Sequence, residues 1–385
     1  MTSNEPTKKA RLADQKNTTS TECRMKLKPI VPVEFTEDIP LHDAYVGILI
    51  NKKDIAIAIK QISTFLPGFG HLKRCSNNRL LLSFKKEKSQ LIKNLEPSFE
   101  TEDELKQFLT DKKFNLNLFE NNFVIVPVCR TAPRSSAQAQ KAAKSWPVSF
   151  HPDIELESIL NGTFFTPDQQ DVIRACMQVC IEATKKEDID NEICSGGVVI
   201  LNPNDHGTSK ILAISTARVN EHPMWHGSML AIDLIAAMRG KGAWNLVPSE
   251  NPLKNIDNKK RKPESNLPLC YPSTLSTINI PKFEYPADVK SKSKTDDARE
   301  DCKYLCTKYW VFLDQEPCAM CAMALLHSRV GMVFYNAANK THGVLGSKTS
   351  LHTLPGLNHR YKVWSSALER DSSETIINLP LKCKQ

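Results

Sequence analysis

The stretch of residues 309–329 limits the possible folds of this chain more than any other, because it joins a strand, a cysteine pair and a helix. Residues 309–313 are Tyr-Trp-Val-Phe-Leu, a run of aromatic and apolar side chains that is typical of a buried strand. Pro317 lacks a backbone N–H donor and favours the first position of a helix. Cys318 and Cys321 therefore fall in the first helical turn and share one face of it. The unpaired amides and the positive dipole end of that turn favour thiolates, the form of cysteine that binds a cation.

A single Cys-x-x-Cys pair fits three kinds of site: half of a four-cysteine zinc site, a redox pair, or two packed thiols. The first needs a second Cys-x-x-Cys pair, which the sequence lacks. The redox interpretation needs a thioredoxin-like context, whereas residues 322–326 predict an apolar core helix. A further candidate ligand is His226, in the first turns of a helix that is predicted to begin near His222. One histidine and two cysteines leave one tetrahedral position open, as in catalytic zinc sites.

These candidate ligands carry a family resemblance. His-x-Glu on one helix and Pro-Cys-x-x-Cys on the next form the signature of the zinc-dependent cytidine and adenosine deaminases, and this chain resembles that superfamily. It departs at one position, because Ser228 stands where the signature has glutamate. Over about residues 146–364, and in particular in residues 316–329, 343–347 and 351–361, the chain is similar to the non-catalytic subunit of the eukaryotic tRNA wobble-adenosine deaminase.

The resemblance implies a heterodimer in which a catalytic subunit keeps the glutamate and converts adenosine to inosine at the first anticodon position of tRNA. It also implies that His226, Cys318 and Cys321 bind Zn2+, which would have a structural role here. No catalytic residue is expected in this chain, because the hydroxyl of Ser228 does not titrate near neutrality and cannot move the two protons of the reaction. The expected partners are that catalytic subunit and tRNA.

Two other functions remain open at this point. One is an active deaminase that uses another acid, and the other is a stand-alone RNA-binding scaffold with a deaminase fold and no deaminase partner. Asp233 is an acid on the same predicted helix, but it lies seven residues beyond His226. That spacing is about 10 Å along a helix axis at about 1.5 Å per residue, so Asp233 is predicted to be a capping or interface residue.

With 385 residues the chain exceeds one ordinary core, so about two domains joined by linkers are expected. It has no apolar run long enough to cross a membrane and begins with a polar segment, which supports neither a membrane span nor a secretory signal. We therefore expect an intracellular protein, in nucleus and cytoplasm, whose 12 cysteines are mostly reduced or bound to metal. The pairs Cys176/Cys180 and Cys302/Cys306 are predicted to be ordinary thiols. A net charge of +8 favours a polyanionic partner only slightly.

The first part of the chain predicts a small α+β domain between two less ordered segments. Residues 1–38 are polar and are predicted to be a disordered tail, as are residues 365–385 at the other end. Residues 39–130 show the order strand, helix, two strands, helix, strand, which is typical of a ferredoxin-like domain. Its strands are expected near 45–50, 70–74, 79–84 and 123–128, and its helices near 54–66 and 102–110.

The second and third of these strands are rich in basic residues. Between residues 71 and 93 the single acid is Glu87, and the basic residues are Lys73, Arg74, Arg79, Lys85, Lys86, Lys88 and Lys93. One interpretation is a solvated hairpin face. The other is a surface that binds the phosphates of RNA without reading its bases, and the family resemblance favours this second interpretation.

The second part of the chain predicts an α/β domain. Residues 131–145 contain no large apolar side chain and are predicted to be a linker, so the next domain is expected to begin at Trp146. Up to about residue 364 the order is helix, two strands, helix, strand, helix, strand. This order predicts a three-layer sandwich with the zinc site at two helix N-termini. Residues 241–301 are predicted to be a flexible basic insertion, in which the cluster at 259–262 fits a nuclear import signal or a solvated loop.

Overall fold

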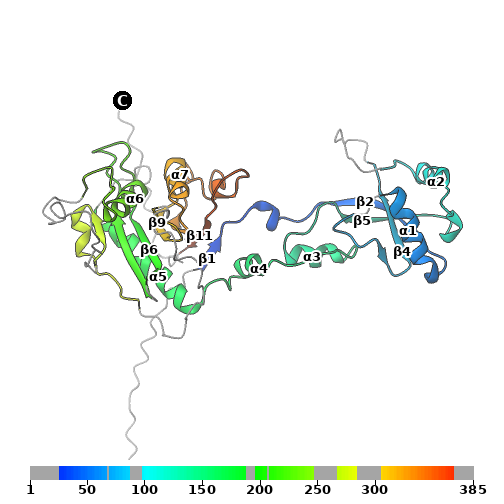
Figure 1. Cartoon of the computed structure of the whole chain (residues 1–385), viewed down its shortest axis with the longest axis horizontal. Coiled ribbons are helices and arrows are strands. Elements are labelled where there is room, and N and C mark those ends of the chain that lie inside the picture. Colours follow the sequence, from blue (N-terminus) through cyan, green and yellow to red (C-terminus); the bar gives the residue numbers. More distant parts are fainter. Residues whose placement is uncertain are drawn as a thin grey trace, which may run out of the picture.

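The computed structural model describes residues 26–66, 69–86, 98–187, 196–205, 208–246, 267–283 and 305–367. These residues form two lobes that lie apart along the long axis of the molecule (Figure 1). The small lobe is built on a four-stranded sheet, and the large lobe is built on a seven-stranded sheet. None of the helices in these ranges has both the length and the apolar character that crossing a membrane requires.

The large lobe contains a mixed sheet in the order β1-β11-β10-β9-β6-β7-β8. Strand β9 runs parallel to β10, and β10 runs parallel to β11, whereas β6 is antiparallel to both β7 and β9. The strand predicted at residues 309–313 is confirmed as β9. The strand bounds are β6 Val198–Asp205, β7 Thr208–Ser215, β9 Trp310–Gln315, β10 Met332–Ala337 and β11 Lys362–Ala367.

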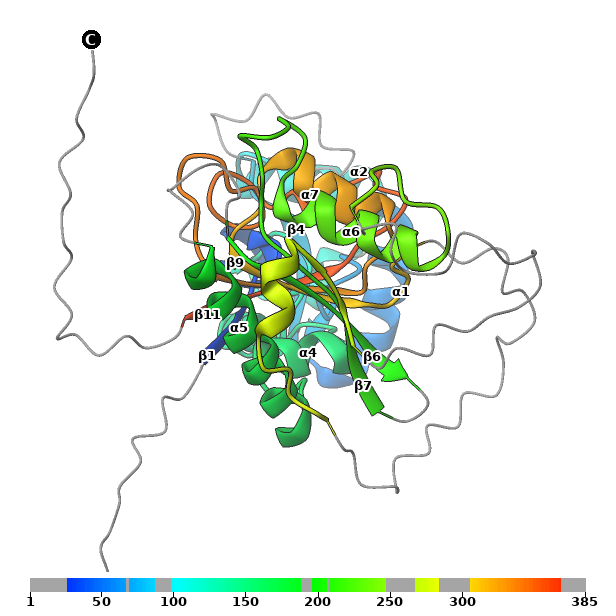
Figure 2. The same ribbon diagram turned by 90° about the vertical axis from the view of Figure 1, so that its left-hand side faces the viewer.

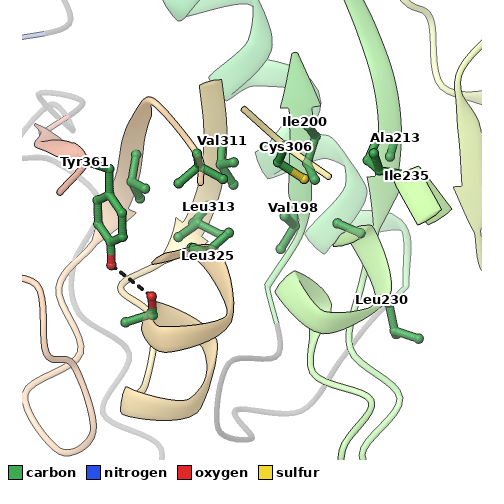
Figure 3. Packing of buried hydrophobic residues seen from close by; sticks show 14 of the residues in the cluster. Val198, Ile200, Ala213, Leu230, Ile235, Cys306, Val311, Leu313, Leu325 and Tyr361 are labelled. Atoms are coloured by element: carbon green, nitrogen blue, oxygen red, sulfur yellow. Dashed lines mark hydrogen bonds between the residues drawn. The ribbon is translucent and has the colours of Figure 1, made fainter. Parts of the chain in front are cut away.

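Helices cover both faces of this sheet. Helices α6 (Gly227–Met238) and α7 (Ala319–His327) lie together on one face, and α5 (Pro167–Lys186) lies on the other (Figure 2). Because successive side chains of a strand point to opposite faces, Val198 packs toward α6 and α7 while Val199 packs toward α5. The resulting core under α6 and α7 is shown in Figure 3, where the Tyr361 hydroxyl donates to the backbone oxygen of Ala322 at 3.1 Å.

Helix α5 begins at a capping box. Thr166 is the N-cap, Pro167 occupies the first turn, and the side chain of Gln169 accepts a hydrogen bond from the Thr166 backbone N–H. This capping box satisfies donors that the first turn of a helix leaves free. The buried thiols Cys176 and Cys180 lie on the inner face of the helix and are free, as expected.

The small lobe has the element order that the sequence predicts. Its four-stranded sheet has the order β3-β4-β2-β5, and every neighbouring pair is antiparallel. Helices α1 and α2 pack on one face of it through Ile62 and Leu105. The strand expected near 70–74 is wrong, because the structure places a two-residue strand at Cys75–Ser76 instead. The bounds are β2 Leu41–Ile48, α1 Ile55–Phe65, β3 Cys75–Ser76, β4 Arg79–Phe84, α2 Glu102–Asp111 and β5 Val124–Cys129.

The linker predicted at 131–145 is wrong, because these residues contain helix α3 (Ser136–Ala143). Ser135 and Gln138 form a capping box at its start, and the small side chain of Ala142 allows the helix to pack against the second face of the small sheet. Trp146 is 2% exposed in the same cluster and donates from Nε1 to the Lys73 backbone oxygen at 2.7 Å. Trp146 therefore completes the small lobe and does not begin the next domain.

The tail predicted over residues 1–38 is wrong from Lys26 onward. Strand β1 (Lys26–Pro29) pairs antiparallel with β11, and Leu27 packs into the core of the large lobe. Strand β11 itself runs to Ala367, which places the first residues of the predicted C-terminal tail in the sheet. The chain thus begins its described course in the large lobe, passes to the small lobe and returns through α3 and α4 (Ile154–Leu160).

The two passages between the lobes are joined to each other. Gln138 of α3 donates from Nε2 to the backbone oxygens of Glu34 at 2.9 Å and Glu37 at 2.6 Å, and Lys141 forms an ion pair with Asp38. The small lobe is consequently an insertion between β1 and α4 with two tethers, and not an N-terminal domain on one tether.

The prediction of a flexible insertion at 241–301 is wrong in part, because some of these residues are folded. Strand β8 (Leu269–Tyr271) extends the sheet parallel to β7, and the short helix at Ser273–Thr277 buries Leu275 in the core under α5. The basic cluster at 259–262 lies outside the described residues, as does Cys302. The apolar residues of these short elements are few and lie between long polar stretches. Such a pattern is too weak to predict the elements from the sequence.

Candidate metal centre

The three predicted zinc ligands lie at the starts of two neighbouring helices. His226 is the N-cap of α6 and Cys318 is the N-cap of α7, and both have extended backbone angles. Their backbone oxygens accept the first helical hydrogen bonds, from Leu230 N at 3.0 Å and Ala322 N at 2.9 Å. Cys321 follows in the first turn of α7 and is fully buried. Because the helices pack side by side, their caps bring all three side chains to one point.

The distances between these side chains fit a tetrahedral zinc ion. Nδ1 of His226 lies 3.7 Å from the Cys318 sulfur and 3.5 Å from the Cys321 sulfur, and all three candidate ligand atoms are within 4.8 Å of one another. Zinc bonds of about 2.3 Å to sulfur and about 2.0 Å to nitrogen, at tetrahedral angles, separate the two ligand atoms by about 3.6 Å. The His/Cys/Cys donor set also suits zinc, since thiolates and imidazole are the ligands that zinc prefers.

Ser228 lies beside this centre and is buried. Its side chain is 3% exposed and lines a cavity of about 10 Å³ together with residues that include Gln315 and Pro317. That volume holds about one water molecule, whereas pockets for small molecules measure roughly 300–1,000 Å³. None of the residues that line this cavity carries a carboxylate.

The buried acids near the ligands in sequence already have partners. Asp233 accepts hydrogen bonds from the backbone N–H groups of Ala243 at 2.6 Å and Trp244 at 3.2 Å, which ties the loop after α6 back onto the helix. This agrees with the structural role expected for Asp233. Glu316 is fully buried and accepts hydrogen bonds from several donors of the loop after β10. Neither carboxylate is placed to replace the missing glutamate.

Glu316 was not singled out from the sequence as a functional residue. The available signal was its position, an acid directly before Pro317 and Cys318 at the end of an apolar strand. A charged group is rarely fully buried unless it is paired or hydrogen-bonded, so an acid in such a run indicates a set of dedicated donors.

The predicted RNA-binding residues of the small lobe differ in how they are placed. Lys73 and Arg79 are exposed, and Lys85 is half-buried. Lys86 is also exposed, and its Nζ lies 3.3 Å from Oε1 of Glu100 in an ion pair. Lys88 and Lys93 lie outside the described residues. Their role in RNA binding stays a prediction.

Arg74 does not belong to the exposed face of this hairpin. Its guanidinium lies 5.7 Å from the centre of the Phe69 ring and donates to the Leu66 backbone oxygen at 3.1 Å. Burial lowers its pKa to about 10, so the side chain remains charged at neutral pH while it packs inside the lobe. These contacts tie Arg74 to the structure of the lobe, and its role in RNA binding stays a prediction.

Comparison with known proteins gives relatives over most of the chain. A protein of Danio rerio named "Probable inactive tRNA-specific adenosine deaminase-like protein 3" is 28% identical, and the match covers 88% of this chain and 91% of the relative. The chain is a relative of the inactive deaminase-like proteins. Because such a match spans most of both sequences, the relationship to the inactive deaminase-like proteins is not confined to one lobe. No family model matches the sequence.

Two further matches are more distant. The "tRNA-specific adenosine deaminase TAD3" of Arabidopsis thaliana is 27% identical, with 71% of this chain and 78% of the relative covered. A chain from a structural study of A-to-I editing by tRNA:A34 deaminases is 14% identical and covers 50% of this chain and 98% of its own length. Its TM-score of 0.30 is too low to support a conclusion.

Proposed function

We propose that this chain is the non-catalytic, tRNA-positioning subunit of a heterodimeric tRNA adenosine deaminase, which converts adenosine 34 to inosine. The observation that carries this proposal is an intact His226, Cys318 and Cys321 set beside Ser228 and a cavity of about 10 Å³. A chain that keeps these candidate ligands but has serine at the position of the proton carrier fits the role of a non-catalytic subunit. The names of its relatives agree with such a role.

The loss of the glutamate accounts for the loss of turnover. General acid–base catalysis contributes about 10²- to 10⁴-fold to the rate, and deamination needs a proton at the ring nitrogen and another on the departing ammonia. When bound, zinc would lower the pKa of a water and polarise it, whereas the buried carboxylates of Asp233 and Glu316 are already engaged by backbone N–H donors. The contribution left to His226, Cys318 and Cys321 is to cross-link the starts of α6 and α7 through the metal.

The architecture supports the assignment of both lobes. Helices on both faces of the large sheet fit the three-layer deaminase sandwich, with the metal centre where two helices begin. The strand–helix–strand–strand–helix–strand order and the fully antiparallel sheet of the small lobe fit a ferredoxin-like domain. We assign RNA binding to the basic side chains of this lobe, the exposed Lys73, Arg79 and Lys86 and the half-buried Lys85, since cations on a hairpin bind the phosphates of RNA whatever its sequence.

The catalytic partner is proposed to bind the face that carries α6 and α7. Met320 and Met323 of α7 are half-buried and lie on this face, and methionine side chains adapt readily to a partner surface. Metal binding would keep this face in shape, because it fixes both helix starts. Residence in both nucleus and cytoplasm is also proposed, on the basis of the basic cluster at 259–262.

Assembly with a catalytic subunit tests this function. The full-length chain is co-expressed with a glutamate-containing tRNA adenosine deaminase subunit and passed over a size-exclusion column with tRNA. We expect a one-to-one protein complex that binds tRNA more tightly than the catalytic subunit alone. Separate elution of the two chains, with tRNA affinity unchanged by this chain, would refute the proposal in favour of a stand-alone protein.

A further inference from the structure

A network of hydrogen bonds connects the residues just before Cys318 to the loop after β10. We call residues 337–347 the clasp loop. The Glu316 backbone N–H donates to Ala337 O at 2.8 Å, and the Pro317 backbone oxygen accepts from Val344 N at 3.2 Å. The Glu316 carboxylate accepts the remaining bonds, from Asn339 N at 3.0 Å, Leu345 N at 2.8 Å, Ser347 N at 3.0 Å and the Ser347 hydroxyl.

The Glu316 carboxylate is a fully enclosed acceptor. Its residue is 0% exposed, and both oxygens receive donors from the clasp loop. A hydrogen bond to a charged group stabilises the fold more than one between neutral groups, and its loss is costly when the group stays buried and unpaired. An amide in place of the carboxylate would direct its N–H groups at backbone N–H donors, so the arrangement requires two acceptor oxygens.

Gly343 provides an independent sign that the clasp loop is wrapped around this carboxylate. A Cβ atom at Gly343 would overlap Oε2 of Glu316 and the backbone oxygen of Asn339. Both of these neighbours are held by their own hydrogen bonds, since Asn339 O accepts from Gly343 N at 2.8 Å. The backbone therefore approaches the carboxylate as closely as glycine alone permits.

We infer that Glu316 is a positioning residue that couples the clasp loop to the metal centre. Residues 316 and 317 are held by the loop, and the next residue, Cys318, is both a candidate ligand and the N-cap of α7. The loop thereby fixes where the Cys318 sulfur lies before the metal arrives. Coupling of this kind is reciprocal, so the metal stabilises the loop by the same free energy with which the loop strengthens metal binding. The inference depends on the metal binding of the proposed function.

Hydrogen exchange on the full-length chain tests the coupling without any substitution. The zinc-loaded chain is compared with the same chain after removal of zinc by a chelator. Exchange in peptides that cover Leu345 and Ser347 is expected to become at least about tenfold faster, because these amides lose a fixed acceptor. Peptides that cover Leu105 and Leu109 of α2, in the small lobe, are the internal control and should not change.

Three variants test whether the clasp loop in turn strengthens metal binding. Glu316→Gln is expected to lower zinc affinity about tenfold in competition with a chelator, in the range typical of residues that orient ligands. Ser347→Ala removes one donor of several and should have a smaller effect. Asp233→Asn alters the other buried carboxylate that holds a loop, and should leave zinc affinity unchanged.

The outcomes separate the two proposals. If the wild-type chain binds no zinc at all, the metal centre of the proposed function is wrong. If it binds zinc but exchange at Leu345 and Ser347 is the same with and without the metal, only the coupling through Glu316 is overturned. Should Glu316→Gln fail to fold, the experiment on the wild-type chain still decides between these outcomes.

Discussion

Nδ1 of His226 lies 3.5 Å from the sulfur of Cys321, although the two residues are 95 positions apart in the sequence. Two separate helix starts, at the caps of α6 and α7, bring them together. The insertion at 241–301, which contains β8, and strand β9 lie between the two residues in the sequence. The centre is therefore a product of the fold, and a metal bound there would join segments that are distant in the chain.

Cys318→Ala is predicted to abolish metal binding. Two ligands hold zinc far more weakly than three, so the zinc content should fall from about one per chain to about zero by elemental analysis. The midpoint of thermal unfolding should drop by roughly 5 °C, because the folded state loses a bound ligand. Cys306→Ala is the matched control: that thiol is also buried, its pKa is raised to about 12 by burial, and its loss should leave the zinc content intact. Full zinc content in Cys318→Ala would disprove the ligand assignment.

Ser228→Glu is predicted not to create a deaminase. The cavity beside Ser228 has room for about one water, so the larger side chain overpacks it. The substitution should cost about 1–3 kcal/mol of folding free energy in denaturant unfolding and yield no inosine from the isolated chain. Ser228→Ala, which adds no volume, should retain nearly full stability. Restored turnover in Ser228→Glu would show that the site is open to substrate.

Replacing Lys85 and Lys86 together with alanine is predicted to weaken tRNA binding. The slope of log affinity against log salt is negative, and its magnitude should fall by about 0.7–0.9 for each phosphate that is no longer neutralised. For the pair, the slope should therefore become shallower by up to about 1.8. Binding is measured over a range of salt concentrations. Lys60→Ala with Lys112→Ala, on the helices of the same lobe, is the charge-matched control. An unchanged affinity and slope at low salt would remove the hairpin from the RNA path.

Strand β1 is predicted to stabilise the large lobe, and truncation tests this. Removal of residues 1–25 should leave the unfolding midpoint of the large lobe unchanged. Removal of residues 1–31 deletes the strand that pairs with β11 and the side chains of Leu27 and Ile30, which pack into the two cores. Burial of such side chains contributes about 1.5–3 kcal/mol each when complete, so a loss of about 3 kcal/mol is expected. Equal stability of the two truncations would show that β1 contributes nothing.

The sequence predicts the helix start at Cys318 well because its signals are local. A proline before a cysteine pair marks a helix start, and the apolar runs around 309–313 and 322–326 place that start at the end of a buried strand. The element order of the small lobe also follows from periodicity alone.

The wrong predictions depend on contacts between distant segments. Residues 26–30 contain too few apolar positions to predict a strand, and only the exposed edge of β11 makes them one. Residues 136–143 are mostly alanine and polar residues, which predict no core helix until the second face of the small sheet is present to be covered.

The central claim is that this chain keeps a metal centre but lacks the residue that moves protons. Inosine formation in tRNA by the purified, zinc-loaded chain tests this claim most directly. The chain is assayed alone and after addition of an equimolar glutamate-containing deaminase subunit, which is also assayed by itself. We predict no inosine from this chain alone and a rate with both chains that exceeds the rate of the added subunit at least about tenfold. Turnover by the isolated chain at a rate comparable to the pair would contradict the account.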